Sequence, residues 1–306
     1  MPESKLTSMP DAVARFVPDG AAVCMGTALE AAIPFAAGHE MIRQRRRDLT
    51  LIGPISDMLF DQLIGAGCVA RFIGAWVGNV SSGLGHNYRR AMERGIPRAM
   101  VVEDHSNFTI ALALLATTVG APYIPTRSLL GTSFVDVNEG FKRATDPWSG
   151  DPLVLVPAVV PDVTVLQVQR ADVHGRCHLW GTLGISREAA FAARTVIVVA
   201  EDIVPTGTIL GDPNLVLVPD VKVGAVVHEP FGALPSPLQG CYGRHHESFA
   251  RYHEASRTVE GFERWLEEWV LGVEDWKAFL DKLGGETLRA LMPRAPRLST
   301  PLDYGA

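Results

Sequence analysis

Short runs of valine, isoleucine and leucine alternate with amphipathic stretches through the first 120 residues. The apolar runs predict strands at 21–26, 49–54, 69–78 and 98–104. The stretches that follow them, in which apolar residues recur every three or four positions, predict helices at 27–47, 56–67, 86–95 and 108–120. Because the strand runs are apolar throughout, both faces of the sheet must be covered. The pattern therefore predicts an α/β fold with an open, mainly parallel sheet and helices on both faces.

The second half of the chain shows a different pattern. Residues 163–181 alternate apolar and polar positions around a polar DVHG turn, which predicts a hairpin-like excursion. A helix from residue 187 and a strand from residue 195 follow, and then a loop rich in proline and glycine at 232–246.

Two aromatic stripes end the apolar pattern. Their members are Phe262, Trp265, Leu266 and Trp269, and then Trp276, Phe279, Leu280 and Leu283. The three- and four-residue spacing predicts core-facing helices, and the glycines at 284 and 285 predict their end. We expect one domain over residues 1–285 with a helical C-terminal part, and a proline-rich C-terminal tail at 286–306.

Composition and charge narrow the class of protein. A hydrophobic content of 47% fits a globular core, and a formal net charge of -6 argues against a nucleic-acid surface. We interpret the basic run RQRRR at 43–47 as the solvated end of a helix. The four cysteines are scattered without a CxxC motif, and no secretory signal precedes them, so we expect a reducing cytoplasm. Prolines and polar residues interrupt the longest apolar stretches, and we expect no membrane segment.

Several common catalytic and binding motifs are missing from the sequence. It contains no GxxxxGK[ST] or GxGxxG loop for nucleotide phosphates and no GxSxG elbow for a nucleophilic serine. His246 and His253 stand seven residues apart on one predicted helix face, but no third ligand has a compatible spacing. We therefore predict no metal site.

Three polar clusters follow predicted strands, where open α/β sheets bind their ligands. They lie at 78–87, 102–107 and 125–134. Glycines let a ligand approach the backbone closely, and an arginine can hold a carboxylate. The candidate catalytic residue is Glu103, and the candidate substrate-binding residues are Ser81, Ser82, Gly83, His86, Asp104, Arg127 and Ser133.

Each candidate also has a structural interpretation. Ser81 and Ser82 can cap a helix, and Ser106 or Asn107 can do the same for the helix that follows them. Arg127 can pair with a surface acid. An acid such as Glu103, close to a helix N-terminus, is favoured by the helix dipole without any catalytic role.

The chain resembles the α subunit of glutaconate-type family I CoA-transferases over nearly its whole length. The segments that carry the resemblance are VVEDHSNFT, GAPYIPTRSLLGTS, DVHGRCHLWG, VIVVAEDIVP and FGALPSPLQGCYGRHHESFARYHE. The resemblance implies a sheet of the sugar-phosphate isomerase and CoA-transferase type. This implication agrees with the architecture predicted from the apolar pattern.

The resemblance also implies an activity. Such enzymes combine α and β subunits, often as α2β2, and move CoA between an acyl-CoA and a small carboxylic acid. A glutamate of the β subunit forms a mixed anhydride and then a glutamyl-CoA thioester. The α subunit shapes the acid site, where Ser81–Gly83 match a serine-glycine loop and Glu103 and Asp104 match an acidic pair. The CoA thioester is then a substrate, and no permanently bound cofactor is expected.

Two other functions are known for similar folds, and the first of them stays open at this point. Steroid-ring hydrolases are similar in fold and subunit plan but use an α-subunit glutamate near this strand end to open a cyclic CoA thioester with water. Glu103 is the candidate for that catalytic base. Ligand-sensing domains of transcription regulators share the fold too, but they follow a helix-turn-helix, for which the segment before residue 21 is too short.

Overall fold

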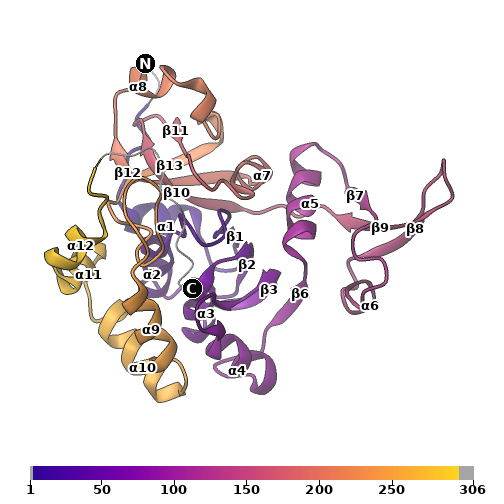
Figure 1. Cartoon of the computed structure of the whole chain (residues 1–306), viewed down its shortest axis with the longest axis horizontal. Coiled ribbons are helices and arrows are strands. Elements are labelled where there is room, and N and C mark those ends of the chain that lie inside the picture. Colours follow the sequence, from indigo (N-terminus) through magenta and orange to yellow (C-terminus); the bar gives the residue numbers. More distant parts are fainter. Residues whose placement is uncertain (1–2, 296–306) are drawn as a thin grey trace.

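The computed structural model describes residues 3–295, and its main element is a large open sheet (Figure 1). The strand order is β13-β12-β10-β1-β2-β3-β6, with β11 paired to β10. All pairs along this order are parallel, and only β11 is antiparallel, so the predicted sheet type is confirmed. The strands are β1 (Ala22–Cys24), β2 (Leu49–Ile55), β3 (Val69–Trp76), β6 (Val101–Asp104), β10 (Val163–Ala171), β11 (Cys177–His178), β12 (Thr195–Ile203) and β13 (Val223–His228).

Helices cover both faces of this sheet, as the apolar strands predicted. Neighbouring strand residues enter different apolar clusters: Val23 and Leu51 pack with the helices of one face, and Cys24 and Ile52 with those of the other. The first group of helices is α1 (Met9–Phe16), α2 (Phe35–Arg43), α3 (Asp57–Gly65) and α4 (His86–Arg94), and the second is α5 (Asn107–Thr118) and α7 (Ser186–Ala192). Among the described residues, no helix is long and apolar enough to cross a membrane.

Helix α2 is shorter than the helix predicted at 27–47. It begins only at Phe35, after Pro34. Proline disfavours helical backbone in the residue before it, and Leu29 and Ala32 have φ angles of 63° and 53°, which an α-helix does not accommodate. The segment after β1 is therefore a loop at the carboxyl end of that strand.

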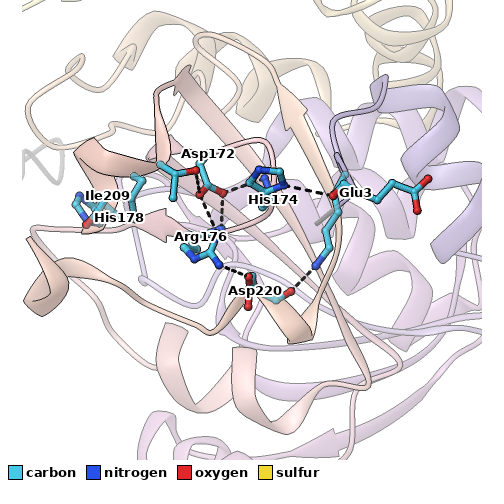
Figure 2. Close-up of polar contacts among 9 residues, drawn as sticks. Glu3, Asp172, His174, Arg176, His178, Ile209 and Asp220 are labelled. Atoms are coloured by element: carbon cyan, nitrogen blue, oxygen red, sulfur yellow. Dashed lines mark hydrogen bonds and ion pairs between the residues drawn. The ribbon is translucent and has the colours of Figure 1, made fainter. Parts of the chain in front are cut away.

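The DVHG segment forms the predicted hairpin between β10 and β11 (Figure 2). The buried carboxylate of Asp172 accepts hydrogen bonds from the backbone N–H of His174 at 2.9 Å and of Arg176 at 3.0 Å. The Arg176 guanidinium pairs with Asp220 at 2.7 Å, and the Asp220 carbonyl accepts a bond from Lys5 at 2.6 Å. These contacts make DVHG a structural turn that also holds the N-terminal segment. Short elements nearby are α8 (Thr206–Leu210), η1 (Pro213–Leu215) and η2 (Asp220–Lys222).

A layer of C-terminal helices completes the first face of the sheet. The predicted aromatic stripes are buried there, since Phe262, Trp265, Trp269, Trp276 and Phe279 all belong to the main apolar cluster. The helices are α9 (His246–Ala255), α10 (Val259–Leu266), η3 (Glu267–Leu271), α11 (Trp276–Leu283) and α12 (Gly285–Leu291). The tail predicted at 286–306 begins inside α12, and its last eleven residues lie outside the described part of the chain.

A second, smaller sheet protrudes from the molecule at the right of Figure 1. It is antiparallel with the order β7-β9-β8, and the apolar pattern did not predict it. We call residues 121–158 the arm. Its elements are β7 (Tyr123–Thr126), α6 (Phe134–Val137), β8 (Lys142–Thr145) and β9 (Pro152–Pro157).

Candidate functional site

A small hairpin carries the predicted serine-glycine loop. It consists of β4 (Gly78–Asn79) and β5 (Gly83–Leu84) and joins the carboxyl end of β3 to α4. Asn79 is buried and fixes the turn: its carbonyl accepts the Ser82 N–H and its Oδ1 accepts the Ser81 N–H, both at 3.0 Å. Gly83 has a φ of 100°, which favours glycine. Helix α4 begins after Gly85 without a side-chain cap, so neither serine caps it, and both are exposed at the tip.

Glu103 and Asp104 form the carboxyl end of β6. Within the described residues, β6 is the edge strand of the large sheet next to β3. The Glu103 carboxylate makes an ion pair with Arg71 on the neighbouring strand β3. The arginine neutralises a charge that would otherwise repel an anionic ligand. Arg71 was not among the predicted site residues, because nothing in sequence relates position 71 to position 103.

Residues 105–109 explain the rest of this polar cluster. Ser106 caps α5: its Oγ accepts the Thr109 N–H at 3.1 Å, and the Thr109 hydroxyl accepts the Ser106 N–H at 2.9 Å. The structural interpretation of Ser106 is confirmed. His105 is buried with its ring 5.0 Å from that of Phe141, and burial lowers its pKa to about 4. It therefore stays neutral and belongs to the core.

The strand arrangement brings the polar clusters at 78–87 and 102–107 together at the carboxyl ends of the strands. β3 and β6 are parallel neighbours, with Ile73 opposite Glu103 and Gly74 opposite Asp104. The hairpin that follows β3 and the acidic pair that ends β6 therefore share the carboxyl edge of the sheet. Parallel α/β sheets bind ligands at this edge.

His86 lies at the start of α4, directly after the hairpin. Its ring centroid is 4.6 Å from that of His253 on α9. Burial, and then the charge of His253, lowers the pKa of His86. His246 and His253 do share helix α9, but the described residues contain no group of three side chains suited to a metal ion.

The third cluster lies on the arm. Arg127 pairs with Asp151, with 2.5 Å between Nη2 and Oδ2, and its side chain is 65% exposed. This is the pairing with a surface acid that the structural interpretation of Arg127 predicted. The alternative role of Arg127, binding the carboxylate of a substrate, stays a prediction. Ser133 stands at the N-terminus of α6 without a capping hydrogen bond. Asn138 follows the last residue of this helix, and its Nδ2 donates to the Asp104 carbonyl at 2.8 Å, so the arm is attached to the end of β6.

A buried ionic cluster at the carboxyl ends of β1 and β2 was not predicted. The Arg244 side chain is 0% exposed and lies 2.8 Å from the Asp57 carboxylate and 3.5 Å from that of Glu30. Burial, followed by the charge of Asp57, raises the pKa of Glu30 to about 8. Burial also raises the pKa of Asp57. We interpret the cluster as a protonated Glu30 beside an Asp57–Arg244 ion pair.

Comparisons with known proteins agree with this arrangement. A family model described as "Coenzyme A transferase" matches residues 6–229. The chain is 37% identical to the A-type subunit of 3-oxoadipate CoA-transferase from Pseudomonas knackmussii, over 92% of this chain and 98% of that protein. It is 30% identical to the A-type subunit of glutaconate CoA-transferase from Acidaminococcus fermentans, over 93% of each chain.

A solved structure and a more distant relative complete the comparison. The crystal structure of the Acidaminococcus fermentans glutaconate CoA-transferase superimposes with a TM-score of 0.91, at 29% identity and over 98% of this chain and 99% of that one. This match confirms the CoA-transferase type of fold. The cholesterol ring-cleaving hydrolase IpdA subunit of Mycobacterium tuberculosis is 25% identical over 56% of this chain and 62% of its own length.

Proposed function

This chain belongs to the coenzyme A transferase family as an α-type subunit, and we propose that, with a β subunit, it transfers CoA to a small dicarboxylic acid. The observation that carries the proposal is the near full-length match to the A-type subunits of two transferases. The acids in their names, 3-oxoadipate and glutaconate, are both dicarboxylates. We further propose that the enzyme is cytoplasmic, that it assembles as α2β2, and that it needs no permanently bound cofactor.

The chemistry divides between the two subunits. In the proposed reaction, a β-subunit glutamate attacks the acyl-CoA carbonyl and forms an acyl-glutamyl anhydride, and the CoA thiolate leaves. The thiolate then attacks the glutamyl carbonyl, which releases the first acid and leaves a glutamyl-CoA thioester. The second acid reverses these steps and departs as its CoA ester. Neither water nor a redox partner is consumed.

The α chain would position the acid. The exposed tip of the β4–β5 hairpin places Ser81 and Ser82 where their hydroxyls can reach a carboxylate or the oxyanion of an addition intermediate. Because Arg71 pairs with Glu103, an anionic acid can approach this edge with less repulsion. These two features support a carboxylate site at the open edge beside β6.

Reconstitution tests the proposed function. We expect the isolated chain to show no CoA transfer from succinyl-CoA or acetyl-CoA to a panel of short dicarboxylates. Addition of the β-type subunit encoded by the same genome should give turnover with ping-pong kinetics. The measurement is the appearance of the new CoA ester by liquid chromatography. Robust transfer by the isolated chain would contradict the division of roles between the subunits.

Ring-opening hydrolysis is a second candidate function, because Glu103 stands at the end of a strand and the chain also matches the IpdA subunit. Substitution of Glu103 distinguishes this function from CoA transfer. If the complex is a transferase, Glu103→Gln should reduce turnover less than about 10-fold, because Glu103 then only lines the site and takes no part in the bond-breaking steps. A hydrolytic base would instead lose about 100- to 10,000-fold. Borohydride trapping with mass spectrometry should find the thioester on the β chain in both wild type and variant. An unmodified β chain, with a cyclic CoA ester consumed, would favour the hydrolase.

A further inference from the structure

The arm and the strand beside it expose large apolar side chains. Trp148, at the tip of the β8–β9 turn, is 92% exposed. Val101 of β6, Tyr123 and Val137 of the arm, and Phe108 and Val119 near the two ends of α5 are exposed as well. Exposed apolar groups as large as a tryptophan, when they adjoin other apolar surface, are typical of sites where a partner binds.

The arm is built to hold these groups in place. Phe141, Val154 and Val156 are buried in the same cluster as Ile110 of α5, so the small sheet shares a core with the main fold. The turn at its tip is ordered as well. Asp146 Oδ1 accepts the backbone N–H of Trp148 at 2.8 Å and that of Ser149 at 3.1 Å. A side chain presented on an ordered turn loses little backbone entropy when it binds.

The charges of the arm are largely satisfied within it. Arg127 pairs with Asp151, and Arg143 pairs with Asp136 at 2.7 Å. The arm therefore presents apolar groups among charges that already neutralise each other. An aromatic anchor with few unpaired charges around it is characteristic of the centre of a protein–protein interface.

The arm begins at the candidate site. Asn138 binds the Asp104 carbonyl at 2.8 Å, and the Phe141 ring packs on His105, so two contacts tie the arm to the end of β6. β6 is the outermost strand on this side in residues 3–295, and Val101 in it is 57% exposed. In the proposed function the β subunit brings its glutamate to the carboxylate site beside β6, and a chain that docks there has the arm next to it.

We propose that the arm is the docking surface for the β subunit, with Trp148 as its anchor. The proposal rests on the proposed function, which requires a second type of chain at this edge. A second copy of this chain is the competing occupant, and the experiment distinguishes the two.

The test measures the affinity between the purified chain and the β-type subunit of the same genome. Trp148→Ala should raise the dissociation constant at least about 30-fold, as loss of an interface anchor does, and Val137→Asp should weaken binding as well. Val221, which is 83% exposed in η2 outside the arm, provides the matched controls Val221→Ala and Val221→Asp. Both controls should bind like wild type, and the melting temperature of every isolated variant should stay unchanged.

Activity gives a second readout. At saturating β subunit, Trp148→Ala should recover the turnover number of wild type, because the side chain helps assembly and does not touch substrate. Hydrogen exchange of the wild-type complex should show protection at 144–152.

The outcomes separate the two proposals. If wild type becomes active on binding the β subunit, but Trp148→Ala and Val137→Asp bind equally well, the arm proposal is wrong and the proposed function stands. If wild type stays inactive with the β subunit, the proposed function itself fails. If the isolated chain is a dimer that Trp148→Ala converts to a monomer, with unchanged affinity for the β subunit, the occupant is a second copy and the proposal is overturned.

Discussion

Replacing Arg244 by leucine is expected to lower the free energy of unfolding by about 3–5 kcal/mol, because it leaves the buried Asp57 carboxylate without its cation. Arg244 is 0% exposed and contacts both Asp57 and Glu30. Its guanidinium carbon also lies 3.5 Å from the centroid of the Phe249 ring. Leucine carries no charge, so the substitution also removes this cation–π interaction. Urea denaturation of the isolated chain at pH 7 is the measurement.

A matched substitution shows whether burial is the cause. Arg257→Leu removes another arginine from the end of the same helical layer, where the Arg257–Glu254 pair is exposed and 3.2 Å long. We expect it to change stability by less than about 1 kcal/mol. If Arg244→Leu were equally mild, the buried cluster would not be holding the C-terminal helices to the ends of β1 and β2.

Between pH 6 and 9, wild type is expected to lose stability relative to the Glu30→Gln variant. The folded pKa of Glu30 is raised from 4.5 to about 8, so its protonated form stabilises the fold at low pH. This contribution is complete below pH 4.5 and is lost as pH rises through about 8, on the order of 3 kcal/mol between pH 6 and 9. The protonated Glu30 carboxyl group donates a hydrogen bond to Asp57. The amide of glutamine can donate in the same way, and it stays neutral at every pH in this range.

Denaturation midpoints at several pH values test this dependence. Glu201 and Glu229, whose pKa values burial raises to about 7, add falls of the same sign, and Glu30→Gln leaves these in place. The buried His39 and His105, whose pKa values burial lowers to about 3 and about 4, act in the opposite direction and are also unchanged in the variant. The control Glu263→Gln, on the exposed face of α10, should keep the wild-type slope. A wild-type slope in Glu30→Gln would show that the Glu30 proton does not contribute to the pH dependence of stability.

The architecture could be predicted from the amino-acid sequence, because the relevant signals are local. Apolar runs such as 49–54 and 69–78 predicted buried parallel strands, and β2 and β3 lie there. The DVHG turn and the stripe of Trp265 and Trp269 were also identified correctly, since a hairpin and an amphipathic helix each depend on neighbours only a few residues away. Ser106 was identified as a cap for the same reason.

Contacts between distant residues could not be predicted in this way. Arg71 reaches Glu103 because β3 and β6 are neighbours in the sheet, and Arg244 reaches Asp57 across 187 positions of the chain. The arm was missed because its short strands at 123–126 and 142–145 have no long apolar run and gain their stability from packing against α5. Local preference fixes which segments form strands and helices, whereas ion pairs and protruding surfaces arise from strand order and packing, which no short window of sequence contains.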